Sequence, residues 1–183
     1  VGRDHLSIAL YYMQKNELDS AQKYIDLAVE DEALNKDAKT WHYRGYLYKE
    51  LYKTKEKTDK KSPLRVLSIE AYEKGIEIGY NDDLSQQTSK ALKYLAQTLY
   101  NDAVRSLTPE DYKLAITTFD TYRKTMKSSN PNHDFSKDDV KFKMALASML
   151  NKPLENPYKT DSAEIIYVKQ LYFEILEIDE NNP

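Results

Sequence analysis

The side chains that could bind a metal ion or transfer protons are few and scattered along the chain. The three histidines, His5, His42 and His133, lie in separate segments. None of them has a second histidine or a carboxylate at the i, i+4 spacing by which one helix presents two metal ligands. We therefore expect these histidines to pack in the core or lie on the surface, and we expect no metal site and no cofactor.

Motifs of covalent catalysis are equally sparse. Ser20 and Lys23 have the S-x-x-K spacing of some acyl-transfer enzymes, but no companion motif accompanies them. The acidic pairs Asp82-Asp83 and Asp138-Asp139 stand where predicted helices begin, and there a carboxylate stabilises the helix dipole. The chain has no cysteine, which excludes thiolate catalysis, disulfides and cysteine-bound zinc. We expect a protein that is not an enzyme.

The composition predicts a helical fold that buries a core. Hydrophobic residues make up 40% of the chain and charged residues 31%, while 4 glycines and 6 prolines leave few tight turns. The formal charge of −3 argues against general nucleic-acid binding. Acidic residues dilute the lysine-rich run 53–61, which we expect to be a solvated loop. No apolar run reaches the roughly 20 residues that a membrane span requires. Because the chain begins at Val1, we expect it to be part of a longer protein.

Apolar residues recur at helical spacing in eight consecutive segments, which we expect to form helices in an all-α domain of residues 1–183. The segments cover 6–13, 18–29, 37–52, 66–78, 92–107, 112–126, 140–150 and 165–178. Ser62-Pro63 and Thr108-Pro109 have the pattern of an N-cap followed by a proline in the first turn. Gly79 is expected to end the fourth helix.

Consecutive pairs of segments repeat one order of large and small residues. In the first pair, His5, Ile8, Ala9 and Tyr12 are followed by Ala21, Ile25 and Ala28. The order recurs in three further pairs, as Trp41, Arg44, Gly45, Tyr48, Ser68, Tyr72 and Gly75; as Leu92, Leu95, Ala96, Leu99, Ala115, Phe119 and Tyr122; and as Lys141, Met144, Ala145, Ser148, Val168, Tyr172 and Ile175. This order resembles the tetratricopeptide repeat.

The resemblance implies a right-handed α-solenoid of about four antiparallel helix pairs, with units near 4–33, 37–80, 84–127 and 137–180. Small side chains at Ala9, Gly45, Ala96 and Ala145 would let paired helices approach closely. Arg44, Tyr122 and Ile175 depart from the pattern, and three of the four hairpins have long turns. Such long turns are similar to those of tetratricopeptide proteins from the Gram-negative envelope. We therefore expect a bacterial protein of the periplasm or cytoplasm.

The resemblance also implies a function as an interaction scaffold, in which the first helices of the pairs line a concave groove. The groove positions are Arg3, Leu6, Leu10, Met13, Lys39, His42, Tyr46, Lys49, Lys90, Lys93, Gln97 and Tyr100. Aromatic and basic residues there favour a protein or peptide partner with some acidic character. The alternative is a small-ligand site of the oligosaccharide type, in which some of the 16 tyrosines stack on the ligand.

The last predicted helix is apolar on more than one face, since Ile165, Ile166, Val168, Leu171 and Phe173 do not fall on one stripe. A terminal helix of a repeat array should instead show water a polar face. We therefore expect this helix to be covered, either by a further repeat or by a homodimer contact.

Overall fold

The computed structural model describes residues 4–151 and 162–180, and over these residues it contains helices and no strands. The prediction of an all-α protein is therefore confirmed. None of the described helices is long and apolar enough to cross a membrane. The α-helices are α1 (His5–Gln14), α2 (Leu18–Glu30), α3 (Ala38–Leu51), α4 (Pro63–Ile78), α5 (Asp82–Arg105), α6 (Tyr112–Ser129), α7 (Ser136–Asn151) and α8 (Ser162–Glu180).

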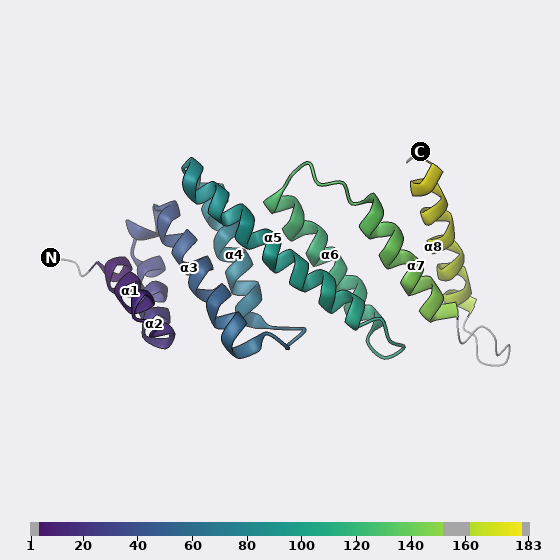
Figure 1. Cartoon of the computed structure of the whole chain (residues 1–183), viewed down its shortest axis with the longest axis horizontal. Coiled ribbons are helices and arrows are strands. Elements are labelled where there is room, and N and C mark those ends of the chain that lie inside the picture. The colour runs from purple at the N-terminus through teal and green to yellow at the C-terminus, as the bar shows by residue number, and fades with distance from the viewer. Residues whose placement is uncertain (1–3, 152–161, 181–183) are drawn as a thin grey trace. The chain divides into compact units, whose positions relative to one another are not determined.

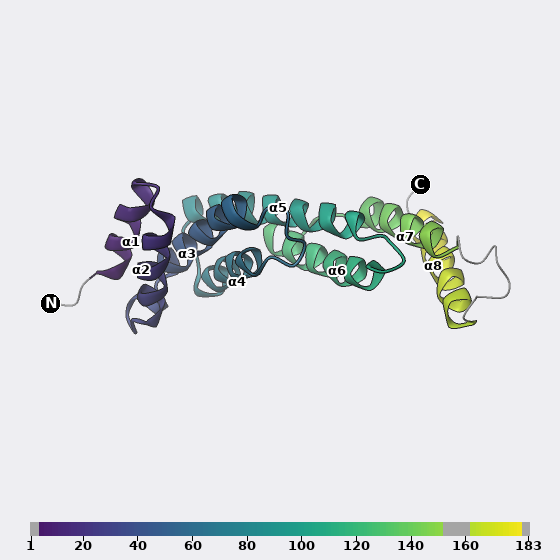
Figure 2. The same ribbon diagram turned by 90° about the horizontal axis from the view of Figure 1, so that it is seen from below.

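The chain divides into two compact units. The first comprises Val1–Gln97 and Thr125–Pro131, and the second comprises Thr98–Lys124 and Asn132–Pro183. Within the first unit α1 packs on α2, α2 on α3, and α3 on α4, while within the second unit α7 packs on α8. Figure 1 and Figure 2 show the partners of each pair side by side. The stripes predicted for α1 and α2 are buried at Ala9, Ala21 and Ile25, whereas Val66, Ile76 and Ile78 of the stripe predicted for α4 are exposed.

The first hairpin packs around alanines. Ala9, Ala21 and Ala28 have no exposed surface, and Ile25 is equally buried between the helices. Because the alanine side chains are short, the two backbones come close and dispersion contacts are dense. The turn between the helices uses Asn16 at a φ of 59°, a left-handed conformation that asparagine tolerates better than most residues.

The second hairpin packs around a glycine. The Ser68 hydroxyl of α4 donates a hydrogen bond of 2.8 Å to the carbonyl oxygen of Gly45 in α3, and the Tyr72 ring packs on the same glycine. A glycine inside a helix costs about 1 kcal/mol relative to alanine. The close contact with Tyr72 gives the physical reason for glycine at this position.

Two predicted ends of α4 are confirmed. The Ser62 hydroxyl accepts a hydrogen bond from the Arg65 amide, and Gly79 ends the helix at a φ of 107°. The predicted start of α6 at Pro109 is wrong, because residues 108–111 form a separate turn in which the Thr108 hydroxyl accepts from the Asp111 amide at 3.2 Å. The expected loop 53–61 likewise begins with a π-helical turn, η2 (Tyr52–Glu56), which continues α3.

Within the first unit, α5 and the end of α6 are joined by paired serines. The Ser89 hydroxyl donates to the carbonyl oxygen of Ser129 at 2.9 Å, and the Ser129 hydroxyl donates to the carbonyl oxygen of Ser89 at 2.9 Å. Such reciprocal bonds need two short side chains at a close helix crossing. On α5, Ala96 is fully buried, as the small-residue pattern predicts.

In α7 and α8 of the second unit, the buried residues differ from those that the repeat pattern predicts. Met144 and Ala145 are exposed, whereas the neighbouring Leu146 and Ala147 are buried. The small residue of α7 that faces the core is therefore Ala147, two positions beyond the predicted one. On α8, Tyr172 was expected to be buried but is 45% exposed. The period fits both registers of α7, and only the packing partners select one of them.

Candidate functional site

The structure distributes the predicted groove residues among several environments. Leu6 and His42 are buried, so neither can contact a partner directly. Leu10 and Met13 pack against the core of the first hairpin. Arg3 lies outside the described residues. The exposed or half-exposed members are on α3 and α5, namely Lys39, Tyr46, Lys49, Lys90, Lys93, Gln97 and Tyr100.

Buried contacts hold α3 against the start of α5. The His42 Nδ1 atom lies 2.9 Å from the Thr88 hydroxyl oxygen, and the His42 ring meets the Tyr80 ring edge-on at 5.8 Å. His42 thus positions the two helices rather than binding a partner. Burial lowers the pKa of His42, and the charge of Lys49 lowers it further against the opposing effect of Asp83.

An aromatic and basic patch follows the exposed sides of α3 and α5 in the first unit. We call it the aromatic–basic surface, and it consists of Tyr46, Lys49, Lys53, Lys90, Lys93 and Tyr94. Tyr46 is 41% exposed and Tyr94 is 38% exposed. The ammonium group of Lys49 stands over the Tyr46 ring, 4.8 Å from its centroid. Burial raises the pKa of Tyr94, and the charge of the nearby Lys53 acts against this rise.

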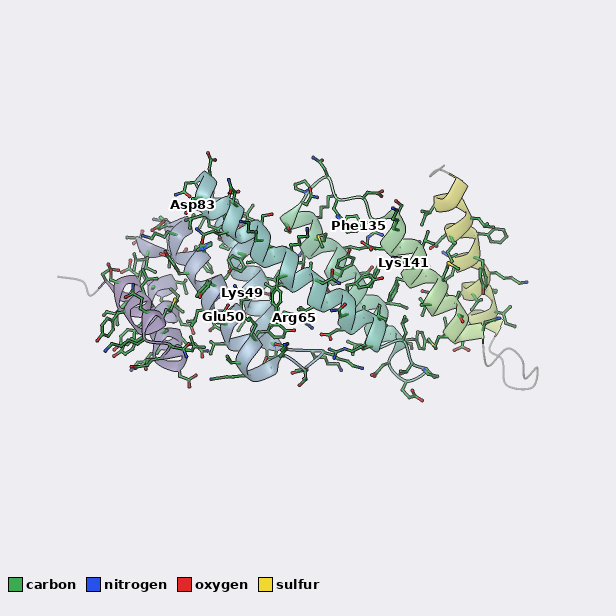
Figure 3. All side chains as sticks on the ribbon, viewed as in Figure 1. Lys49, Glu50, Arg65, Asp83, Phe135 and Lys141 are labelled. Atoms are coloured by element: carbon green, nitrogen blue, oxygen red, sulfur yellow. The ribbon has the colours of Figure 1, made fainter. Side chains whose placement is uncertain are left out.

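One acidic side chain neutralises part of this surface. Glu50 accepts from Lys53 at 2.8 Å and pairs with Lys49 at 3.1 Å, and Figure 3 shows Lys49 and Glu50 together near the end of α3. Burial raises the pKa of Glu50, but the hydrogen bonds from Lys53 and Lys49 outweigh that effect and leave the pKa below its ordinary value. Glu50 is therefore ionised at neutral pH. The four lysines still outnumber the one carboxylate, so the surface carries a positive charge.

Sequence reasoning missed two residues of this surface. Tyr94 follows Lys93 directly and stands four residues after Lys90, which places it on the predicted face of α5. Lys53 stands four residues after Lys49, but it was assigned to the solvated loop. The π-helical turn η2 places Lys53 beside Glu50, and no rule of hydrophobic periodicity predicts such a turn. Tyr100 belongs instead to the second unit, where its ring meets Tyr122 edge-on at 5.2 Å.

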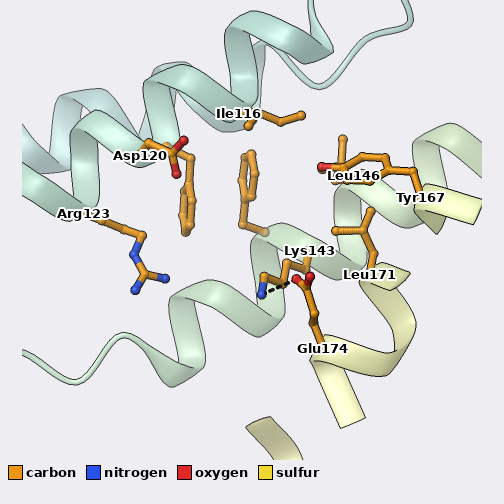
Figure 4. Close-up of a pocket in the computed structure, with 10 residues that line it drawn as sticks. Ile116, Asp120, Arg123, Lys143, Leu146, Tyr167, Leu171 and Glu174 are labelled. Carbon is orange, nitrogen blue, oxygen red and sulfur yellow. Dashed lines mark ion pairs between the residues drawn. The ribbon is translucent and has the colours of Figure 1, made fainter. Parts of the chain in front are cut away.

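The second unit contains a pocket of about 280 Å³ between α6, α7 and α8. Figure 4 shows side chains from all three helices around it. Its apolar base includes Phe119 and Phe142, whose rings stack at 4.0 Å between centroids. The other lining residues are Ile116, Asp120, Arg123, Lys143, Leu146, Tyr167, Leu171 and Glu174.

Most charges of this pocket are already paired. Lys143 and Glu174 form an ion pair of 2.8 Å, and Arg123 donates to the carboxylate of Asp139. Asp120 is exposed and has no ion-pair partner among the described residues. Burial raises the pKa of Tyr167, with further contributions from the charges of Glu174 and Asp120. The pocket is thus a small apolar hollow with a neutral phenol and an available carboxylate.

Among the described residues no group of three or more histidine, aspartate and glutamate side chains could hold a metal ion. His133 lies 3.2 Å from the Asp138 carboxylate at the start of α7, and it does not line the pocket.

Comparison of the chain with protein-family models, with curated proteins and with solved structures gave no match. Of the two sites, the aromatic–basic surface carries the stronger argument, because it combines exposed rings with uncompensated charge.

Proposed function

We propose that this protein is an interaction scaffold built from helical hairpins of the tetratricopeptide type, and that it binds an acidic peptide or protein. The observation that carries the proposal is the aromatic–basic surface. Tyrosines are enriched at interfaces, where their rings bury area at low entropic cost, and the charges around them select the partner. A functional surface of this kind does not need a catalytic pocket.

The packing supports the repeat architecture. The small residues Ala9, Gly45 and Ala96 are buried, and so are Ala21, Ser68 and Ala115 at the matching positions of the following helices. Close helix pairing in successive hairpins is the property from which an α-solenoid is built. On this proposal the hairpins stack into a right-handed array of about four helix pairs.

Charge and shape together favour an extended or helical acidic partner. Lys90 and Lys93 are exposed on one side of α5, together with Tyr94. Lys49 of α3 and Lys53 of η2 complete the surface. A peptide that carries carboxylates and an apolar side chain could pair with the lysines and cover Tyr46 or Tyr94. Because Lys53, Lys90 and Lys93 are exposed to water, binding should weaken as the salt concentration rises.

The test is a binding assay with labelled peptides that differ in the number of aspartates and glutamates. We expect the acidic peptides to bind and the neutral or basic ones to bind at least about tenfold more weakly. Lys90→Glu combined with Lys93→Glu should abolish this preference, and Tyr46→Ala should weaken binding at every peptide charge. Affinity capture with the wild-type protein and with the Tyr46→Ala and Lys93→Ala variants would then identify natural partners.

The matched control reverses two exposed lysines outside this surface, Lys127→Glu and Lys137→Glu. It changes the net charge by the same amount, so an effect of overall charge would appear in both double variants. Equal affinity for acidic and basic peptides, or equal losses in the two double variants, would refute the proposal.

The pocket of the second unit supports a second candidate function, the binding of a small ligand. Its volume of about 280 Å³ is near the lower end of known ligand sites, and Asp120 with Tyr167 offers polar contacts beside an apolar base. A compact cation with an apolar body fits this lining better than an oligosaccharide does, because the phenylalanine rings are buried. Thermal-shift measurements on wild type and on Asp120→Asn, with small aromatic amines as probes, would test it.

A further inference from the structure

Helix α8 has one buried face and one exposed apolar face. Val168 and Leu171 are buried against the rest of the second unit, where α8 packs on α7. On the opposite side Ile166 and Phe173 are each 67% exposed, and Leu176 is 56% exposed. At 3.6 residues per turn, these three side chains fall on one stripe, roughly half a turn from the buried pair. Exposed apolar stripes of this kind mark interaction sites.

The stripe carries two charged residues of opposite sign at equal distances from Phe173 along the helix. Lys169 lies four residues before Phe173, and Glu177 lies four residues after it. Residues four apart share a helix face, so both charges flank the Phe173 ring. If the helix direction is reversed about Phe173, the position of each charge is taken by the opposite charge. The stripe is therefore complementary to a second copy of itself.

We propose that two copies of this protein associate through α8, with the two helices antiparallel about a two-fold axis beside Phe173. In this arrangement the Phe173 rings of both copies meet at the centre. Lys169 of one protomer faces Glu177 of its partner, and the symmetry axis produces this pair twice. Ile166 and Leu176 add apolar contacts on either side of the central ring.

The charge pattern selects this occupant over others. A parallel pairing of two α8 helices would place Lys169 beside Lys169, and like charges in contact oppose association. A helix of unrelated sequence would cover the apolar stripe without any need for the matched charges. A single helix pair buries less area than a standard interface, so the dimer should dissociate on dilution. This association involves neither the aromatic–basic surface nor its peptide partner, and the two proposals can fail separately.

The experiment is sedimentation velocity over a roughly hundredfold range of concentration, with variants that alter only the charges. The wild-type chain should pass from monomer to dimer. Lys169→Glu alone and Glu177→Lys alone should each raise the dissociation constant by about tenfold, because each places like charges across the axis twice. The double variant Lys169→Glu with Glu177→Lys should restore the wild-type constant. A mixture of the two single variants should form a one-to-one heterodimer.

Phe173→Ser tests the apolar centre. Its ring is exposed, so the helix content measured by circular dichroism should not change while the dimer is lost. Lys137→Glu, an exposed charge change outside α8, serves as the control and should leave the dissociation constant unchanged. A wild-type chain that stays monomeric throughout would overturn the proposal. So would a dimer that survives Phe173→Ser, or single-variant losses that the double variant does not reverse.

Discussion

The ring of Tyr72 lies so close to Gly45 that a β-carbon added to the glycine would stand 2.8 Å from two of the ring atoms. Gly45 is on α3 and Tyr72 is on α4, so this contact sets how closely the second hairpin packs. Tyr72 is almost fully buried, and its ring has little room to move away. The identity of residue 45 is therefore determined by the partner helix.

We predict that Gly45→Ala destabilises the protein, although alanine is the better helix former by about 1 kcal/mol. Inserting a methyl group into a packed contact usually costs about 1–3 kcal/mol, and here the tyrosine ring must shift to accommodate it. Urea denaturation of the variant should show a lower midpoint with an unchanged slope.

The same substitution in a Tyr72→Leu background provides the control for Gly45→Ala. If the ring contact is the cause, alanine at position 45 should be neutral or stabilising there, which a double-mutant cycle would detect. An equal loss of stability in both backgrounds would show that the contact with Tyr72 is not the reason.

A matched pair of variants tests the corrected register of α7. Ala147 is fully buried and Ala145 is exposed on the same helix. Ala147→Leu should destabilise the protein by about 1–3 kcal/mol because its core has no space for three more carbons. Ala145→Leu should change stability by less than about 0.5 kcal/mol, as exposed substitutions usually do. Thermal unfolding measures both, and the reverse order would restore the register that the sequence pattern predicts.

These contrasts show what the sequence could and could not predict. Helical periodicity identified the eight α-helices of residues 4–151 and 162–180, because an amphipathic stripe must face the core whatever its neighbours are. The helix caps at Ser62 and Gly79 could also be predicted, since their chemistry is local. The register of α7 could not be predicted, because Ala145 and Ala147 both continue a plausible apolar stripe. Only the contacts with α6 and α8 distinguish the two residues.

The aromatic–basic surface was predicted only in part, because tertiary contacts also decide which of its residues are exposed. The resemblance to the tetratricopeptide repeat implied Tyr46, Lys90 and Lys93 as groove residues, and these three residues are exposed. His42 occupies an equivalent position by sequence but is buried, because Thr88 of α5 supplies a hydrogen-bond partner for its ring. A partner that is 46 residues away along the chain leaves no local signal.

His42 should make the stability of the protein depend on pH. Its ring is surrounded by Thr88, Tyr43, Tyr72 and Tyr80, with the charges of Lys49 and Asp83 nearby, and burial holds its pKa below the ordinary value of 6.5. The unfolded chain therefore takes up the proton first as the pH falls. The stabilisation is complete above the unfolded pKa and is lost as the pH falls from there through the lower folded pKa.

Replacement by glutamine removes this titrating group. We predict that His42→Gln lowers stability at pH 7.5 by about 1–2 kcal/mol, through the altered hydrogen bond to Thr88. Between pH 7.5 and pH 5.5 the variant should lose less stability than the wild type, which denaturant titrations at the two pH values would measure. Parallel losses in both proteins would contradict a lowered pKa at His42.

The stability of the protein should depend on the ion pair between Arg123 and the nearly buried carboxylate of Asp139 in the second unit. The Asp139 side chain is only 11% exposed, and its Oδ1 atom has no hydrogen-bond partner among the described residues, while Arg123 donates to its Oδ2 atom. Removing one partner of a buried ion pair costs roughly 3–5 kcal/mol, but Arg123 is 42% exposed, so water can compensate in part. We predict a loss of about 1–3 kcal/mol for Arg123→Ala.

Asp139→Asn separates two effects on stability, namely the uncompensated charge of Asp139 and the loss of the other contacts of the Arg123 side chain. In the Arg123→Ala background the asparagine removes the uncompensated charge, so it should recover part of the stability measured by urea denaturation. In the wild-type background the same change weakens a charge-assisted hydrogen bond and should destabilise. If Asp139→Asn has the same effect in both backgrounds, the two side chains are not coupled. The contact of the Arg123 guanidinium with the Phe135 ring, whose centroid lies 5.0 Å from the guanidinium carbon, then accounts for the loss instead.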